Sequence, residues 1–228
     1  MGQILRDIYS DSSIAPLLGF KGGTCAYFFY NLPRFSVDLD FDLFDSSEAT
    51  KKIVFEKVEK ILVKYGTIKD RHTKFYTVFF LLSYGTEDRN IKVEINVRPE
   101  ARDSARYYAP KDYLGIPMLI PSPEYMFACK LVALTERPET AMRDIYDVHY
   151  FAKNNWEFDI EVIEKRTNQS VADQLTKCID TIAKVKDNEI MQGLGELVDE
   201  KAKVWVKKHL RAETIFLLKN YLAAITRQ

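Results

Sequence analysis

The sequence predicts an α+β fold in which a mixed α/β lobe at residues 1–121 precedes a helical lobe at residues 122–228. Two observations predict it. Short apolar strands alternate with helix-forming segments in the first half of the chain. Three prolines between residues 117 and 123 then interrupt this pattern, and almost all of the chain after them has helical periodicity. A chain of 228 residues can bury a substantial core in such lobes.

The first lobe is expected to begin with a short helix at residues 4–9 and an apolar strand at residues 15–20. The tetrapeptide Lys-Gly-Gly-Thr at residues 21–24 predicts a turn, after which Thr24 can cap a helix over residues 26–30. The remaining elements are predicted as strands at residues 38–44, 76–82 and 91–97, a long helix at residues 48–65, a turn at residues 85–88 and an irregular crossover at residues 108–123.

The second lobe is predicted to be helical from residue 124 onward. Residues 124–135 and 139–152 form its first two helices, because their apolar residues recur at helical spacing and Pro138 separates them. About three further helices are expected before residue 228. No internal repeat or low-complexity segment is visible in the sequence.

Composition and charge exclude several classes of protein. The three cysteines, Cys25, Cys129 and Cys178, form no CxxC pair and have no histidine cluster nearby, so we expect reduced thiols rather than a zinc site or disulfides. Lys plus Arg equals Asp plus Glu at 33 each, which gives no sign of a strong nucleic-acid binder. The longest apolar stretch, residues 76–84, is too short to span a bilayer and no signal peptide is visible, so we expect a cytoplasmic protein without a membrane anchor.

Alternating acids mark the predicted strand at residues 38–44. Asp38, Asp40 and Asp42 would share one face of this strand, and Glu94 lies on the polar face of the predicted strand at residues 91–97. Clustered carboxylates are the oxygen ligands that Mg²⁺ prefers. We therefore expect Asp38 and Asp40 to bind divalent ions, with Glu94 completing the site and accepting a proton. The alternative is a half-exposed edge strand with solvated acids, and Glu94 alone could be an ordinary exposed residue.

The Gly22-Gly23-Thr24 segment could hold phosphates. Backbone N–H groups at the start of a helix favour an anion, and the glycines leave no bulky side chain in the way. The Thr24 hydroxyl would add a further hydrogen bond. Glycine pairs are common in turns, so the weight of this motif comes from its place before a predicted helix and upstream of the acids.

The helical lobe carries a second group of charged residues. Lys130 lies on the apolar helix at residues 124–135, and Asp144 and Asp147 lie one turn apart on the next helix. If the two helices pack side by side, Lys130 approaches Asp144. Such a pair contributes about 0–1 kcal/mol when it is exposed and purely structural. At the rim of a phosphate site, the lysine would instead neutralise triphosphate charge while the aspartate orients it.

One strongly basic segment could contact nucleic acid. Residues 201–211 contain five cations and no acid, together with Trp205 and His209. The solvated face of an amphipathic helix is the more ordinary interpretation of this pattern.

Together these motifs resemble the AbiEii/AbiGii-type nucleotidyltransferase toxins, a branch of the DNA polymerase β-like superfamily found in type IV toxin–antitoxin and phage-defence systems. The resemblance covers roughly residues 14–153. It rests on KGGT at residues 21–24, RFSVDLDFD at residues 34–42, KVEI at residues 92–95, and Lys130 with RDIYD at residues 143–147. It implies a polymerase β-like nucleotidyltransferase lobe followed by a helical lobe.

The resemblance also implies roles for individual residues. Asp38, Asp40 and Glu94 match the family's metal-binding carboxylates, while Lys130 matches its nucleotide-contacting lysine and Asp144 the paired acid. Asp147 could take the place of Asp144. Arg34 and Ser36 match residues that brace the loop. The residues expected to bind the nucleotide are Lys21, Gly22, Gly23, Thr24, Arg34, Ser36 and Lys130.

The expected function is Mg²⁺-dependent transfer of an NMP from an NTP to an acceptor such as a tRNA 3′ end, with Mn²⁺ as the alternative ion. The protein would be a toxin with a cognate antitoxin. A small-molecule or protein acceptor is an alternative, since the fold does not fix the acceptor. A catalytically silent partner-binding module is disfavoured by the retained acids. A nuclease of the PD-(D/E)xK type would need a lysine where Asn96 stands.

Overall fold

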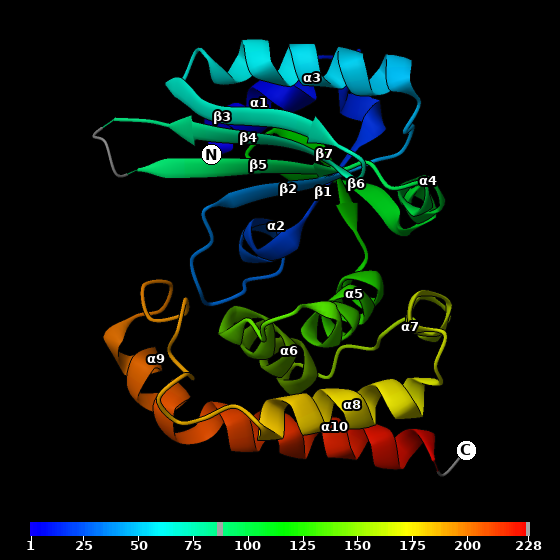
Figure 1. Ribbon diagram of the computed structural model, residues 1–228, viewed down its shortest axis with the longest axis vertical. Coiled ribbons are helices and arrows are strands. Elements are labelled where there is room, and N and C mark those ends of the chain that lie inside the picture. The colour runs from blue at the N-terminus through cyan, green and yellow to red at the C-terminus, as the bar shows by residue number, and fades with distance from the viewer. Residues whose placement is uncertain (86–88, 227–228) are drawn as a thin grey trace. The chain divides into compact units, whose positions relative to one another are not determined.

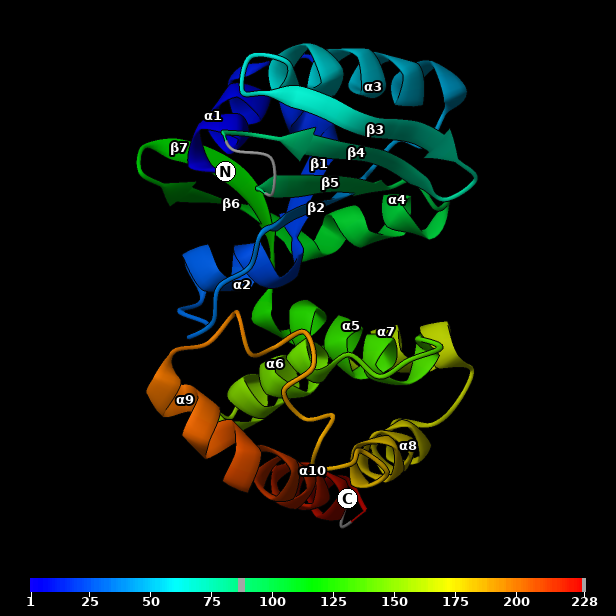
Figure 2. The same cartoon turned by 60° about the vertical axis from the view of Figure 1, so that its left-hand side comes forward.

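The computed structural model describes residues 1–85 and 89–226 of the chain. The chain divides into two compact units (Figures 1 and 2). Unit 1 contains Met1–Asn31 and Phe35–Ser122, and unit 2 contains Leu32–Arg34 and Pro123–Gln228. The short segment Leu32–Arg34 thus belongs to the helical unit, although it lies within the first predicted lobe.

A mixed sheet forms the centre of unit 1, and seven strands take part in it among the described residues. Their spatial order is β3-β4-β5-β2-β1-β7-β6. The pairs β2–β5 and β1–β7 are parallel, and the other neighbours are antiparallel. The strands are β1 (Leu18–Lys21), β2 (Asp38–Leu43), β3 (Thr67–Lys74), β4 (Thr77–Ser83), β5 (Asn90–Asn96), β6 (Tyr108–Tyr113) and β7 (Ile116–Pro121).

The two faces of this sheet differ in polarity. Helices α1 (Gly2–Ser10) and α3 (Glu48–Leu62) lie on one face, and α2 (Gly22–Phe29) lies on the other (Figure 1). The face toward α3 is apolar: alternate residues of β2, β4 and β5 are buried there, and the rings of Phe55 and Phe80 lie 4.9 Å apart. The acids of β2 and β5 occupy the opposite face, because successive side chains alternate along a strand. The short helix α4 (Glu100–Ser104) follows β5.

The region before β2 differs from its prediction. Residues 15–20 were expected to be a strand, but Ala15–Leu17 form a 3₁₀ helix with Pro16 near its start, and only Leu18–Lys21 pair in the sheet. The predicted turn at residues 21–24 and the Thr24 cap are also wrong. Helix α2 begins directly at Gly22 and Lys21 is its N-cap, because the positive φ of Gly22 lets the chain turn within a single residue.

The predicted crossover at residues 108–123 is wrong as well, because residues 108–121 form the β6–β7 hairpin. Strand β6 lies at the edge of the sheet, where Pro110 removes no hydrogen bond that the sheet needs. The other edge strand, β3, was not predicted. Its polar, largely exposed sequence lacks the alternation that marks a half-buried strand. Of the turn predicted at residues 85–88, residues 86–88 lie outside the described part of the chain.

Unit 2 is helical, as predicted. The two helices expected at residues 124–135 and 139–152 are confirmed as α5 and α6 with shifted ends. The helices are α5 (Pro123–Glu136), α6 (Met142–Lys153), α7 (Ile160–Thr167), α8 (Val171–Ala183), α9 (Glu200–Trp205), a π-helical turn (Val206–Leu210) and α10 (Arg211–Ile225). Among the described residues, none of the helices has the length and apolar character needed to cross a membrane.

Candidate active site

The acids of β2 and β5 lie side by side on the polar face of the sheet. The parallel register places Asp40 directly opposite Glu94 and Asp38 directly opposite Lys92. Asp38 and Asp40 are half-buried and Glu94 is exposed. Paired residues of adjacent strands point to the same face, so the expectation that these three carboxylates share a face is confirmed.

The start of helix α2 packs against Asp40. Gly22 has a φ of +80°, and a Cβ atom at this position would overlap the Asp40 carboxylate. Register also pairs Lys21 with Asp40 across the antiparallel β1–β2 pair. Two independent features therefore require a glycine at residue 22: its positive φ and the close approach of the Asp40 carboxylate.

Asp42, the third acid of β2, is held in a buried network. Its carboxylate accepts hydrogen bonds from the Lys21 ammonium, from Asn96 Nδ2 at 2.7 Å and from the Tyr108 hydroxyl at 2.7 Å. Burial alone would raise the pKa of Asp42, but the Lys21 charge and these hydrogen bonds outweigh it and hold the pKa below its usual value. Asp42 therefore serves the structure, and the Lys21 ammonium is engaged with it.

The expected phosphate-binding residues occupy different environments. Thr24 is fully buried within α2, and its hydroxyl donates to the backbone carbonyl of Asp38. This bond fixes the start of β2 against the first turn of α2. Ser36 is half-buried in the loop before β2, whereas Arg34 belongs to unit 2. The backbone N–H groups of Gly22 and Gly23 remain at the helix start, where the first N–H groups have no intrahelical partner.

The donor set of this face suits a hard divalent ion. Asp38, Asp40 and Glu94 offer carboxylate oxygens from two adjoining strands, and Mg²⁺ and Mn²⁺ prefer oxygen ligands. Within residues 1–85 and 89–226, no group of three His, Cys, Asp or Glu side chains already converges closely enough to hold an ion. The donor types thus suit a divalent ion, although the described side chains do not form a ready-made metal site.

Unit 2 contains a buried cluster of charged residues. Arg34 binds Asp147 through two parallel contacts, Nε to Oδ1 at 2.6 Å and Nη2 to Oδ2 at 2.7 Å. Lys130 Nζ lies 2.7 Å from Asp144 Oδ1 and 2.8 Å from Asp147 Oδ2. Both aspartates are fully buried. The sequence left open which aspartate pairs with Lys130, and the structure shows that both do.

Electrostatics stabilise the charged forms in this cluster. Burial would raise the pKa of Asp147, but the adjacent Lys130 and Arg34 charges hold it below its usual value. Burial would lower the pKa of Lys130, and Asp144 and Asp147 raise it instead. Asp144 Oδ2 lies 3.0 Å from Arg137 Nε without a hydrogen bond of good geometry to it. The charged forms of Lys130 and Asp147 are therefore both stabilised.

The family model of the nucleotidyl transferase AbiEii toxin of type IV toxin–antitoxin systems matches residues 3–212. The chain belongs to this family. It is accordingly a nucleotidyltransferase of the toxin type, and the AbiEii match reaches well beyond the motifs recognised in residues 14–153.

Solved structures share the fold of this AbiEii chain. A Helicobacter pylori protein described as a nucleotidyltransferase is 20% identical, with 99% of this chain and 95% of that chain covered and a TM-score of 0.61. MenT4, a nucleotidyltransferase toxin from Mycobacterium tuberculosis H37Rv, is 17% identical, with 98% of this chain and 90% of that chain covered and a TM-score of 0.61. At these identities the likeness establishes the mixed sheet with flanking helices and the helical part that follows. No curated protein matches the sequence.

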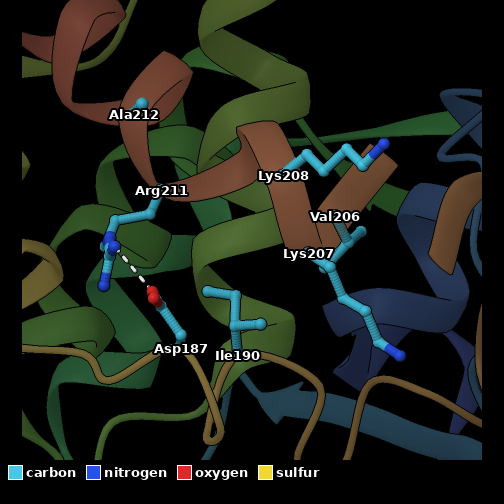
Figure 3. Close-up of a pocket in the computed structure, with 7 residues that line it drawn as sticks. All are labelled: Asp187, Ile190, Val206, Lys207, Lys208, Arg211 and Ala212. Atoms are coloured by element: carbon cyan, nitrogen blue, oxygen red, sulfur yellow. Dashed lines mark ion pairs between the residues drawn. The ribbon is translucent and has the colours of Figure 1, made fainter. Parts of the chain in front are cut away.

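The basic segment at residues 201–211 of the AbiEii chain runs through α9, the π-helical turn and the start of α10. Lys207 and Lys208 are exposed, and in Figure 3 both side chains extend away from the 2.7 Å ion pair between Arg211 and Asp187. The cavity beside them measures about 50 Å³. Ligand pockets typically reach about 300–1,000 Å³, so this cavity is too small to enclose a nucleotide.

Two partners of Asp42 and the pairing of Arg34 with Asp147 were not predicted from the sequence. Asn96 and Tyr108 hold Asp42, and Asp147 holds Arg34. The periodicity of β5 does place Asn96 on the same face as Glu94, which was a usable signal for one of them. Nothing local in the sequence links Arg34 to Asp147, because that bond joins residues far apart in the chain.

Proposed function

We propose that this AbiEii nucleotidyltransferase uses Mg²⁺, or Mn²⁺ in its place, to transfer an NMP from an NTP to a hydroxyl group of RNA, such as the 3′ end of a tRNA. The observation that carries the proposal is the β2–β5 register. It sets Glu94 beside Asp40, on the face that also bears Asp38 and next to the start of α2. Carboxylates beside a helix N-terminus suit a metal-bound polyphosphate.

The NTP phosphates are assigned to the start of α2. Backbone N–H groups of Gly22 and Gly23 would donate to phosphate oxygens there, and the helix dipole favours the negative charge. Thr24 would hold the first turn of α2 in place, because its hydroxyl donates a hydrogen bond to the Asp38 carbonyl. Lys21 is paired with Asp40 in the sheet and its ammonium group contacts Asp42, so its positive charge would partly offset the negative charge of both acids.

The acceptor is assigned to the Glu94 side. The acceptor oxygen would attack the α-phosphorus of the NTP, forming one O–P bond while the bond from the α-phosphorus to the bridging oxygen breaks and pyrophosphate leaves. Glu94 would accept the hydroxyl proton. Divalent ions held by Asp38, Asp40 and Glu94 would supply charge stabilisation for the attacking and leaving oxygens.

By the family pattern, we assign the buried cluster of unit 2 a role in nucleotide binding. Lys130 would neutralise triphosphate charge, and Asp144 would orient Lys130 through their 2.7 Å contact. Asp147 is shared between Lys130 and Arg34. Arg34 would accordingly act as a positioning residue, as would Ser36 in the same loop.

An RNA acceptor is favoured over a small molecule by the segment at residues 201–211, whose exposed lysines could contact a phosphate backbone. As a toxin of a type IV system, the enzyme would have a cognate antitoxin that relieves growth arrest. Resistance to a drug on expression, in place of growth arrest, would favour a small-molecule acceptor instead.

The test is incubation of the protein with each α-³²P-labelled NTP, Mg²⁺ and total cellular RNA, with RNA and protein resolved on one gel. Asp40→Asn should abolish labelling without loss of folding, because it removes a carboxylate ligand and keeps the side-chain shape. Asp180→Asn, the same change at an exposed position of α8, is the control and should label as the wild type does. Activity retained by Asp40→Asn would contradict the metal assignment, and label on protein would indicate a polypeptide acceptor.

A further inference from the structure

A row of side chains crosses the polar face of the sheet through the candidate active site. Strand register pairs His72 of β3 with Phe79 of β4, Phe79 with Glu94 of β5, Glu94 with Asp40 of β2, and Asp40 with Lys21 of β1. Directly paired residues point to the same face. The five residues therefore form one line perpendicular to the strands, with two aromatic rings at one end and the start of α2 at the other.

The order along this row distinguishes two sides of the site. The helix start that would hold the NTP phosphates follows Lys21, whereas Phe79 lies beyond Glu94. Neighbouring strands are spaced by about 4.8 Å, so the Phe79 position is about 5 Å from that of Glu94 and about 10 Å from that of Asp40. A group bound over Phe79 is thus next to the proposed proton acceptor and away from the phosphates.

The two aromatic rings are stacked and accessible. Their centroids lie 4.8 Å apart with an interplanar angle of 20°. Both residues are half-exposed, and 32% of the His72 side chain is accessible. Phe79 is an aromatic residue on a polar face: the β5 residues that share this face, Lys92 and Glu94, are exposed. A stack of this kind can support a nucleobase, because every base has a π-face.

We propose that Phe79 and His72 form a stacking platform for the 3′-terminal base of the acceptor RNA. The inference rests on the proposed function, which puts the acceptor hydroxyl beside Glu94. The ribose that carries this hydroxyl also carries the base, so a base on Phe79 directs its own sugar toward Glu94. Stacking is tolerant of base identity, so the platform recognises a nucleoside end of RNA rather than a particular sequence.

The test compares two single-stranded RNA oligonucleotides that differ only at the 3′ end. One has a natural terminal nucleotide, and the other has a terminal sugar without a base. Affinity is measured by fluorescence anisotropy without NTP, and kcat/KM is measured by transfer from a labelled NTP. Phe79→Leu keeps an apolar side chain of similar volume but removes the ring. Phe75→Leu is the matched control, because Phe75 is 93% exposed in the β3–β4 turn outside the row.

The wild type should prefer the natural end by about 5- to 100-fold in both measurements, as expected for one base–aromatic stack. Phe79→Leu should reduce this preference to about twofold or less, and Phe79→Trp should restore it. Phe75→Leu should behave as the wild type. A structural role of Phe79 would change the melting temperature without changing the preference between the two RNAs.

Two results would overturn the platform: a wild type that binds or uses both RNAs equally, and a Phe79→Leu variant with the wild-type preference. Failure of the proposed function has a different signature. In that case the wild type labels no RNA at all, while the anisotropy comparison still decides whether the terminal base is bound through Phe79.

Discussion

Glu94 lies directly opposite Asp40 across the parallel pair of β5 and β2, although α3 and two strands separate them along the chain. A parallel pair needs a crossover connection, and here the crossover contributes β3 and β4 to the same sheet. The connection between β2 and β5 therefore also supplies β3 and β4, which extend the sheet on the side of Glu94 away from Asp40.

Gly22→Ala should abolish nucleotidyl transfer and destabilise the protein. The substitution forces an L-residue into a positive φ and drives its Cβ into the Asp40 carboxylate. Gly115→Ala is a matched control, because Gly115 has a φ of +78° with no atom within 4 Å of its would-be Cβ. Gly115→Ala should cost about 1 kcal/mol in urea unfolding and leave transfer intact. Equal activity of the two variants would contradict the close approach of Asp40 to the helix start.

Asp147→Asn should destabilise the protein by about 3–5 kcal/mol, because it leaves Arg34 and Lys130 with an uncompensated excess of buried charge. The comparison is Glu200→Gln, which breaks the exposed 2.7 Å pair with Lys203 and should cost less than about 1 kcal/mol. Urea unfolding of both variants measures the difference. Similar losses would show that the cluster contributes no more to stability than a surface ion pair.

Stability should fall in acid through Asp42 and Asp147, whose pKa values are both held below the usual 3.8 in the folded protein. Between the folded and unfolded pKa values the unfolded chain binds more protons, so stability rises with pH there. The contribution is present above about pH 4 and is lost as pH falls through the folded pKa values. Denaturant unfolding from pH 5 to pH 2 should show this decline, and Asp42→Asn should make it shallower. An unchanged slope in Asp42→Asn would contradict the ionised state of the buried carboxylate.

Lys207→Ala combined with Lys208→Ala should weaken RNA binding and reduce its salt dependence. Removing one lysine–phosphate interaction lowers the slope of log affinity against log salt by about 0.7–0.9. Lys177→Ala combined with Lys184→Ala removes two exposed cations from α8 and its C-cap in the same unit, and this variant should bind RNA as the wild type does. Filter binding of total tRNA at several salt concentrations provides the comparison. If the two double variants bind equally, residues 201–211 have no special part in RNA binding.

Elements whose structure depends on local sequence patterns were predicted, whereas those that depend on distant contacts were not. Strand β2 was predicted because its apolar and acidic residues alternate, and helices α5 and α6 because each is a long segment rich in apolar residues, with Pro138 between them. Edge strand β3 was missed, since its exposed residues carry no such pattern, and β6 and β7 were taken for a crossover because prolines usually oppose strands. The predicted Thr24 cap was wrong because the positive φ of Gly22 starts helix α2 at that residue, before Thr24, with Lys21 as the N-cap.

The sequence by itself determined the family, the two-part architecture and the acids that share one face of β2, because motif spacing and side-chain alternation are properties of the chain alone. Only the tertiary structure decided that Asp42 is locked by Asn96 and Tyr108, and that Phe79 adjoins Glu94. These relationships depend on strand order and register. Register is set by the packing of the whole apolar face against its helices, and no short stretch of sequence contains that information.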